Sequence, residues 1–339
     1  MNILRPDLFH PLVEFAPAAR AALRRVLRAS AVLLLLIWLA SVLSARAAPP
    51  ATASAAPPAA AAKPVAVATI SILADFVRAV AGDTLVVESL VHVGGDPHTY
   101  EPLPSDARRM ARASIIFRNG LGLERWLDKL IGDKPGRPVV TLTDGITSLR
   151  VADGAYAGDP DPHAWMDPRL SLRYVEAVER ALREHYPHHS ATYAANAASY
   201  KAQLLALHDE IRQLMNTVPQ ARRQIVTTHD AFRYYAQRYG LTLVASIWGI
   251  STETEPSARE VARIVSAIRS AGVPAVFVET TINPKLMHRI AAEAKVRVGE
   301  PLYGDSVGKP GSGADTYIGM MRANARAIAR GLGGTEPAP

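Results

Sequence analysis

The sequence predicts an α/β protein in which two parallel-sheet lobes of similar architecture are joined by a long helix. From Val65 onward, short β-branched and aliphatic runs alternate with segments of helical periodicity, which is typical of parallel sheets covered by helices. Between Arg169 and Thr217 only helical periodicity continues, and after Pro219 the alternation resumes. We therefore expect about four strands in each lobe.

The first 47 residues have the pattern of a secretory signal peptide. They contain six arginines against Asp7 and Glu14, a net charge of +4, and four of these arginines, between residues 20 and 28, lie just before the apolar run 31–43. A small-x-small cleavage site ends at Ala47. A membrane anchor is the alternative, but spanning the hydrocarbon takes about 20 apolar residues, more than this run supplies.

The composition after the signal segment predicts a linker and then three further parts. Residues 48–64 are almost entirely Ala and Pro, which favours a flexible linker. We place the N-terminal lobe at residues 65–190, the connecting helix at 191–217 and the C-terminal lobe at 218–335. The Ala-rich connecting helix would span roughly 35 Å.

The elements of the N-terminal lobe follow from its apolar runs and turn residues. A helix is expected over 72–81, a short helix capped by Ser105, and a third helix over 123–131 after the turn at Asn119-Gly120. The strand candidates are 65–70, 85–93, 114–117 and 138–142.

The C-terminal lobe is punctuated by clear helix signals. Ser257-x-x-Glu260 is a capping box and Gly272 ends the same helix, while Asn283-Pro284 begins another. A last amphipathic helix covers 318–332. The strand candidates are 224–228, 241–247, 273–278 and 296–298.

The composition excludes several classes of function. The chain has no cysteine, which excludes disulfides, zinc–thiolate and iron–sulfur sites, a cysteine nucleophile and a lipid-carrying cysteine. The net charge of +7 falls to +3 without residues 1–47, and no block of like charges remains. We therefore expect no nucleic-acid partner.

Four candidate site residues follow predicted strands, where open α/β sheets bind ligands. His98 and His163 lie in loops after the second and fourth strands, His229 after the first strand of the second lobe, and Asp305 after its last strand. Three imidazoles and one carboxylate complete a tetrahedral Zn²⁺ shell, and Mn²⁺ also uses such ligands but prefers more oxygen.

The tripeptide Asp-Pro-His occurs twice, at 96–98 and 161–163, and the proline fixes the backbone before each histidine. We interpret six further histidines as surface or hydrogen-bonded residues. They are His92, His185, His188, His189, His208 and His288.

These motifs resemble those of the zinc- and manganese-binding extracytoplasmic solute-binding proteins of ABC importers. The resemblance covers about Val65–Leu332. The stretches that carry it are PHTYEP (97–102), DPHAWMDP (161–168), THDAF (228–232), ISTETEPS (250–257) and GDS (304–306).

The resemblance implies two lobes hinged on a rigid helix, with the metal in the cleft between them and His98, His163, His229 and Asp305 as its ligands. Histidine at the third position is typical of zinc-type members and glutamate of manganese-type members, so His229 favours Zn²⁺. An aspartate as fourth ligand also occurs in members that accept both metals, which keeps Mn²⁺ as the alternative. The His- and acid-rich loop of many zinc-specific members is absent from the short segment Leu149–Asp161.

The expected function is capture of Zn²⁺ in the periplasm and delivery to an ABC permease and its ATPase. We expect a monomer that is not an enzyme and carries no lipid anchor. Because each histidine must be neutral to bind metal, the affinity should fall toward acidic pH.

Other functions remain as alternatives. A zinc hydrolase would use Glu253 or Asp230 as a base, but catalytic zinc keeps a position open for water and no His-Glu-x-x-His motif occurs. A phosphate loop at 304–310 fails because three residues separate its glycines and Pro310 replaces Ser/Thr. A structural or adhesive surface protein would bind no metal tightly.

Overall fold

The computed structural model describes residues 17–45, 62–131, 137–152 and 156–335, and the chain divides into two compact units at residues 61 and 62. The described part of the first unit is one helix, α1 (Pro17–Ala45), which contains the predicted apolar run. Within the described ranges, no helix combines the length and hydropathy needed to cross a membrane. The predicted cleavage site after Ala47 and most of the predicted linker lie outside the described residues.

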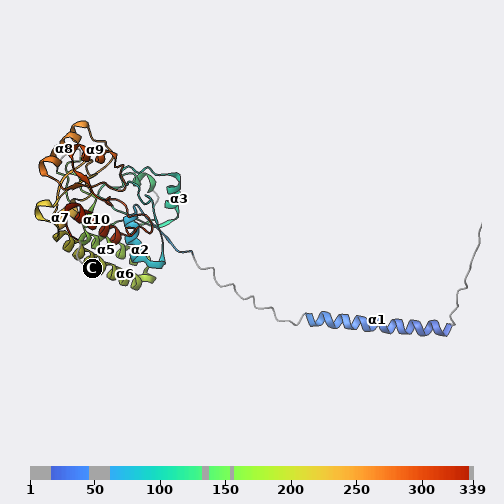
Figure 1. The fold of residues 1–339 in the computed structure, drawn as a ribbon. Coiled ribbons are helices and arrows are strands. Elements are labelled where there is room, and N and C mark those ends of the chain that lie inside the picture. The colour runs from blue at the N-terminus through green and yellow to red at the C-terminus, as the bar shows by residue number, and fades with distance from the viewer. Residues whose placement is uncertain (1–16, 46–61, 132–136, 153–155, 336–339) are drawn as a thin grey trace, which may run out of the picture. The chain divides into compact units, whose positions relative to one another are not determined.

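The first lobe of the second unit (Figure 1) contains a four-stranded parallel sheet, as the alternating pattern predicts. The strand order is β2-β1-β3-β4. Val65 pairs with Val86 on one side of the central strand, and the neighbouring strand pairs Ile116 with Val139. The strands are β1 (Val65–Ala68), β2 (Val86–Ser89), β3 (Ala113–Arg118) and β4 (Val139–Thr141).

The helices of this lobe are α2 (Ser71–Ala81), α3 (Pro104–Arg112) and α4 (Leu127–Ile131). Ser105 does not cap α3 as predicted. Pro104 occupies the first turn, where its missing N–H is not needed, and Asp106 Oδ2 accepts a hydrogen bond of 2.7 Å from the Leu103 N–H. The helix expected over 123–131 starts only at Leu127, because the chain first forms turns.

Two long helices, α5 (Pro168–His185) and α6 (Ser190–Asn216), pack against each other and link the lobes (Figure 1). The 27 residues of α6 span roughly 40 Å. It contacts α2 in the first lobe and α10 (Tyr317–Leu332) in the second. Its buried residues recur at alternating spacings of four and three, which aligns them in one stripe. The stripe consists of Tyr193, Ala197, Tyr200, Leu204, Leu207, Ile211 and Leu214, and Met215 is buried beside its end.

The second lobe has the four predicted strands, but they form two parallel pairs, β5-β6 and β7-β8, rather than one continuous sheet. The Phe277 N–H donates to the Val226 carbonyl across 2.8 Å, so β5 and β7 are still neighbours. The ladder between β7 and β8 is interrupted before the bridge of Glu279 with Leu302, where Pro301 has no N–H to donate. The strands are β5 (Gln224–Thr227), β6 (Thr242–Ser246), β7 (Ala275–Val276) and β8 (Arg297–Val298).

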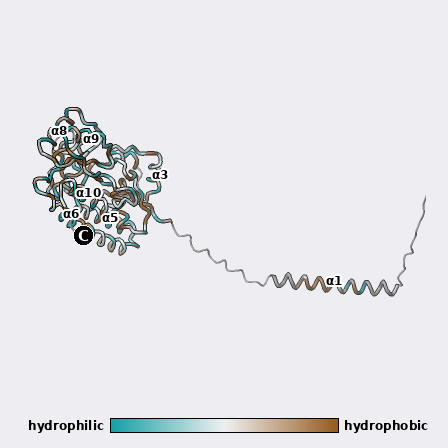
Figure 2. The backbone as a smooth tube through the Cα atoms, viewed as in Figure 1, coloured by the Kyte–Doolittle hydropathy of each residue, from teal (hydrophilic) through white to brown (hydrophobic). Residues whose placement is uncertain are grey.

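The remaining helices are α7 (Arg233–Tyr239), α8 (Ala258–Ala271) and α9 (Lys285–Ala294). The predicted capping box of α8 is present: Ser257 and Glu260 exchange backbone and side-chain hydrogen bonds, and Gly272 follows the helix with φ +64°. Hydrophobic segments run through the interior (Figure 2). One large core joins the first lobe to α5, α6 and α10, and a smaller core packs α8 and α9 on the second-lobe strands.

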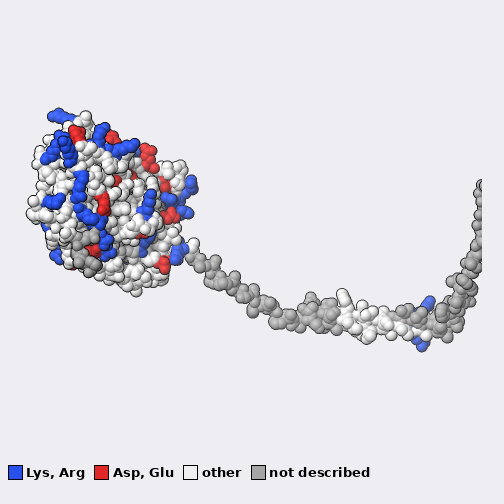
Figure 3. Space-filling model, in the orientation of Figure 1, with Lys and Arg blue, Asp and Glu red and all other residues white. Residues whose placement is uncertain are grey.

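The surface of this unit carries both signs of charge. On the face shown in Figure 3, acidic side chains are interspersed among the basic ones.

Candidate metal site

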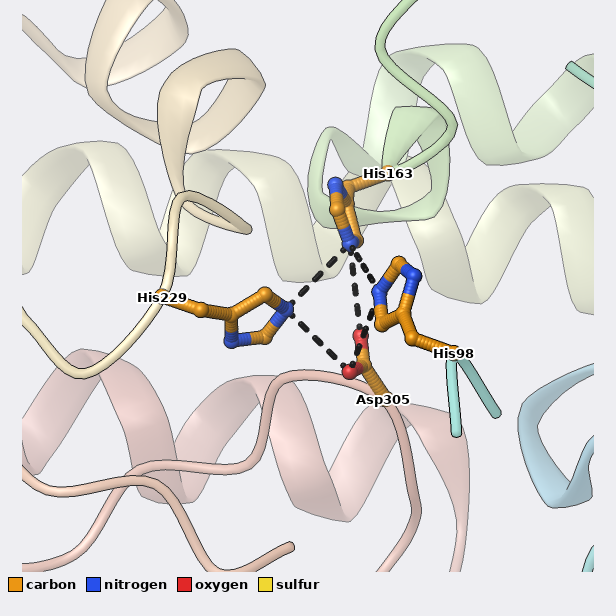
Figure 4. Close-up of side chains that lie close together, drawn as sticks. All are labelled: His98, His163, His229 and Asp305. Atoms are coloured by element: carbon orange, nitrogen blue, oxygen red, sulfur yellow. Dashed lines mark hydrogen bonds and ion pairs between the residues drawn. The ribbon is translucent and has the colours of Figure 1, made fainter. Parts of the chain in front are cut away.

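The structure brings the four predicted residues together (Figure 4). His98 and His163 extend from first-lobe loops, His229 follows β5, and Asp305 lies between β8 and α10. One donor atom from each residue lies within 4.8 Å of every other. The carboxyl ends of strands in both lobes therefore meet at one point, as the strand-end argument predicts.

The distances between the donor atoms match a small ion. His163 Nε2 lies 3.3 Å from Nε2 of both His98 and His229. The carboxylate of Asp305 lies 3.2 Å from His229 Nε2, 3.5 Å from His163 Nε2 and 3.7 Å from His98 Nε2. An ion bound tetrahedrally at about 2.0–2.1 Å separates its donors by about 3.3 Å, so these four side chains have room for one.

Burial differs among the four residues. His163 and His229 are wholly buried and Asp305 is 1% exposed, whereas His98 retains 9% of its surface. Both oxygens of Asp305 face the imidazoles, because Oδ1 is the nearer to His163 and Oδ2 the nearer to His98 and His229. The site is therefore closed on three sides and bordered by solvent only at His98.

The repeated Asp-Pro-His tripeptide forms the same turn in both loops. Asp96 Oδ1 accepts a 2.9 Å hydrogen bond from the His98 N–H, and Asp161 Oδ1 accepts a 3.0 Å bond from the His163 N–H. These are Asx turns, in which the aspartate holds the backbone two residues on. The sequence suggested the role of the proline, and the structure adds that of the aspartate.

Two buried carboxylates orient the imidazoles from outside. Asp161 Oδ1 lies 2.9 Å from His163 Nδ1, and Glu279 Oε2 lies 2.7 Å from His229 Nδ1. Glu279 Oε1 also accepts a 2.7 Å bond from the His229 N–H. Such partners fix the tautomer and leave Nε2 free as a donor to metal.

Neither orienting carboxylate is among the site residues predicted from the sequence. Glu279 follows the predicted strand 273–278 directly, so the strand-end rule that found Asp305 also points to it. Glycine at position 304 allows the loop that carries Asp305 to pass close to Glu279, because a Cβ there would overlap Glu279 Oε2. Asp161 belongs to the repeated tripeptide, but the pattern does not distinguish it from Asp96.

The surroundings of the site shift the pKa values of His98 and His229 in opposite directions. Burial lowers the pKa of His98 to about 3, which keeps it neutral. Burial also acts to lower the pKa of His229, but the carboxylates of Glu279 and Asp305 outweigh it and raise that pKa well above its ordinary value. For Asp305, burial is outweighed by the imidazoles, chiefly His229, and its pKa lies below the usual range.

The other histidines within the described ranges lie away from the site. His208 is half-buried, and its Nδ1 lies 3.2 Å from the Tyr239 hydroxyl. The exposed ones are His92, His185, His188, His189 and His288.

The two possible bases of a hydrolase face other partners. Asp230 Oδ2 lies 3.7 Å from Arg233 Nε, and Glu253 accepts a long hydrogen bond of 3.5 Å from the Tyr156 hydroxyl.

A cavity of about 610 Å³ borders the site at His98. Both lobes line it: Thr99–Glu101 and Trp126 come from the first, and Ile250, Ser251 and Glu253 from the second. His98 is the candidate ligand that lines this cavity.

Comparison with known proteins identifies the family. Residues 66–331 match the family model described as ZnuA, zinc-uptake complex component A, periplasmic. The chain belongs to the ZnuA family. As a member, it is a substrate-binding protein of the kind that serves ABC-type metal importers.

Relatives of this ZnuA-family chain are named for different metals. It is 36% identical over 268 residues to the manganese-binding lipoprotein MntA of Halalkalibacterium halodurans, covering 78% of this chain and 87% of MntA. It is 36% identical over 267 residues to the iron-binding protein YfeA of Yersinia pestis, covering 79% of this chain and 86% of YfeA. The periplasmic zinc-binding protein TroA of Treponema pallidum superposes with a TM-score of 0.75 at 29% identity, covering 80% of this chain and 99% of TroA. The two-lobed α/β fold predicted from the sequence is thereby confirmed.

Proposed function

We propose that this protein captures one divalent transition-metal ion with His98, His163, His229 and Asp305 and delivers it to an ABC permease. The observation that carries the proposal is the donor set itself. Three imidazole nitrogens and a carboxylate from four separate loops converge in a buried place. All donor atoms lie within 4.8 Å of one another, and those of His163 and Asp305 lie 3.2–3.7 Å from the others. Without a cation, burying this carboxylate with its two orienting neighbours would be costly.

Zn²⁺ is the first candidate for the ion. Imidazole donors suit zinc, and the spacings fit a tetrahedral shell. Mn²⁺ is the second candidate, because both oxygens of Asp305 face the site and bidentate binding would add the oxygen that manganese prefers. A relative named for manganese also supports the second candidate.

Delivery requires partners at the membrane. We propose that the protein works in the periplasm as a monomer with an ABC permease and its ATPase, after export directed by residues 1–47. Several relatives are named lipoproteins, but this sequence has no cysteine that could carry a lipid. Release into the periplasm after signal cleavage is the proposal for this chain.

A binding function fits the site better than catalysis does. Catalytic zinc usually has three protein ligands and a water, whereas here a fourth donor already faces the ion's position. Asp230 and Glu253, the candidate bases, have other partners within reach.

Titration calorimetry on the purified, chelator-treated protein tests the proposal. We expect one Zn²⁺ per chain with submicromolar affinity, and competition with Mn²⁺ then ranks the two metals. His188→Ala, which removes an exposed histidine, should bind as the unmodified protein does. Absence of tight binding by either metal would contradict the proposed function.

A further inference from the structure

His98 is held differently from the other two histidines of the site. His163 and His229 each have a carboxylate at Nδ1. Among the described residues, no carboxylate lies within hydrogen-bond distance of the His98 Nδ1 atom, and its loop is fixed through the backbone N–H. His98 is also the residue that borders the cavity. The ion therefore has its shortest path to solvent past the least constrained imidazole.

The carboxylate that holds the His98 backbone is itself held from the opposite lobe. Asp96 Oδ2 accepts a hydrogen bond of 2.5 Å from the Thr252 hydroxyl. Thr252 lies in the second-lobe loop between β6 and α8, and its neighbours Ser251 and Glu253 line the same cavity. A bond this short to a carboxylate is of the strong, charge-assisted kind.

We propose that Thr252 is a positioning residue that controls how fast the metal leaves and enters the site; this inference rests on the proposed function. Thr252, Asp96 and the His98 backbone form a clasp, two hydrogen bonds that run from one lobe to the other beside the cavity. When the clasp is closed, the His98 loop is fixed against the second lobe. When it opens, the Pro97 carbonyl keeps its 2.9 Å bond from the Trp126 indole N–H, but the His98 side chain, which no carboxylate orients, turns more easily away from the ion and exposes it to solvent.

The clasp touches no donor atom, which determines the expected signature. Its loss leaves the four donors and the orienting carboxylates Asp161 and Glu279 in place. Rates of exchange should therefore change more than equilibrium affinity. A hydrogen bond to a charged group is strong enough for its removal to accelerate release about ten- to a hundredfold.

Stopped-flow release measures this directly. The zinc-loaded protein is mixed with an excess of a fluorescent chelator, and the rate is compared among variants. Thr252→Val keeps the shape but loses the hydroxyl, so release should be about ten- to a hundredfold faster. Thr252→Ser keeps the hydroxyl and should release at nearly the original rate. Thr254→Val, an exposed threonine in the same loop, is the matched control and should leave the rate unchanged.

A double-variant cycle separates the clasp from general loosening of the loop. Asp96→Asn weakens the same bond from the other side, so the combination with Thr252→Val should release metal no faster than the faster single variant. The melting temperature of the metal-free protein should be similar for all variants.

Three outcomes would overturn the inference. They are an unchanged release rate in Thr252→Val, equal acceleration in Thr252→Ser, or additive effects of the two substitutions. Each of these leaves the proposed function intact, because it concerns rates in a protein that binds zinc. If the unmodified protein takes up no zinc, the proposed function fails together with the clasp.

Discussion

The two Asp-Pro-His loops share three residues and one turn geometry, yet their second contacts differ. In the loop at 161–163 the aspartate also bonds the imidazole of its own histidine, and its other oxygen lies 3.5 Å from Arg233 Nη1. In the loop at 96–98 the aspartate instead reaches Thr252 across the cleft. Asp161 is fully buried, whereas Asp96 is half-buried.

The difference shows that the tripeptide fixes only the backbone. What surrounds each loop decides whether the imidazole is fixed as well. The buried loop is held further by the Asn119 amide, which donates to the Pro162 carbonyl, and by the Tyr234 hydroxyl, which donates to the Asp161 carbonyl. The loop at 96–98 has one comparable bond within its own lobe, from the Trp126 indole N–H to the Pro97 carbonyl at 2.9 Å. The two loops therefore differ at the imidazole: a carboxylate orients His163, whereas the aspartate beside His98 bonds the opposite lobe instead.

Removal of either loop's histidine should have the largest effect. His163→Ala and His98→Ala each delete a donor atom, and both should weaken Zn²⁺ binding by more than about a hundredfold, the upper range for loss of an orienting partner alone. Calorimetry or chelator competition measures the affinity, with His188→Ala as control. If His98→Ala kept tight binding, this residue would belong to the access route and not to the donor set.

Substitution of the two aspartates should affect different properties of metal binding. Asp161→Asn keeps an oxygen for the turn but weakens the orientation of His163, so affinity should fall about 10- to 100-fold. Asp96→Asn should chiefly accelerate release. The measurements are equilibrium competition and chelator-driven release on the same preparations. Equal losses of affinity in both variants would show that the two loops hold their histidines in the same way.

The four residues that the sequence singled out lie close together in the structure, for a physical reason. Each of the four follows a strand, and parallel strands deliver their carboxyl ends to one edge. Local signals such as the Ser257 capping box were equally direct. The sequence did not predict Thr252 as a partner of Asp96, because the two are 156 residues apart and only tertiary packing brings them together.

Local competition explains the other differences. Pro104 starts α3 in place of the Ser105 cap, because proline suits the first turn and Asp106 supplies the capping acceptor. Pro301 interrupts the ladder that would otherwise join the second-lobe strands more fully. Both prolines are visible in the sequence. Whether such a residue caps a helix or interrupts a strand pair depends on the packed backbone around it.

The smallest effect on metal binding is expected at Asp75, which serves neither loop. It lies on α2, and its Oδ2 accepts hydrogen bonds from the Tyr317 N–H at 2.9 Å and the Tyr200 hydroxyl at 3.2 Å. It therefore joins the first lobe to α10 and α6. Burial raises the pKa of the Asp75 carboxyl despite these two donors.

Asp75→Asn tests whether stability and metal binding can be separated. Because the folded pKa is raised, the native state favours the protonated form, and the stability this gives is present below the ordinary pKa and lost as pH rises through the raised one. Asparagine keeps an acceptor without the charge. The metal-free variant should therefore melt higher at pH 7, by roughly a few degrees, with the gain shrinking toward pH 4. Zinc affinity and release should stay unchanged. A lower melting temperature at every pH would mean that the charged carboxylate stabilises this junction. An altered release rate would mean that the contact of Asp75 with α6 and α10 also affects metal exchange.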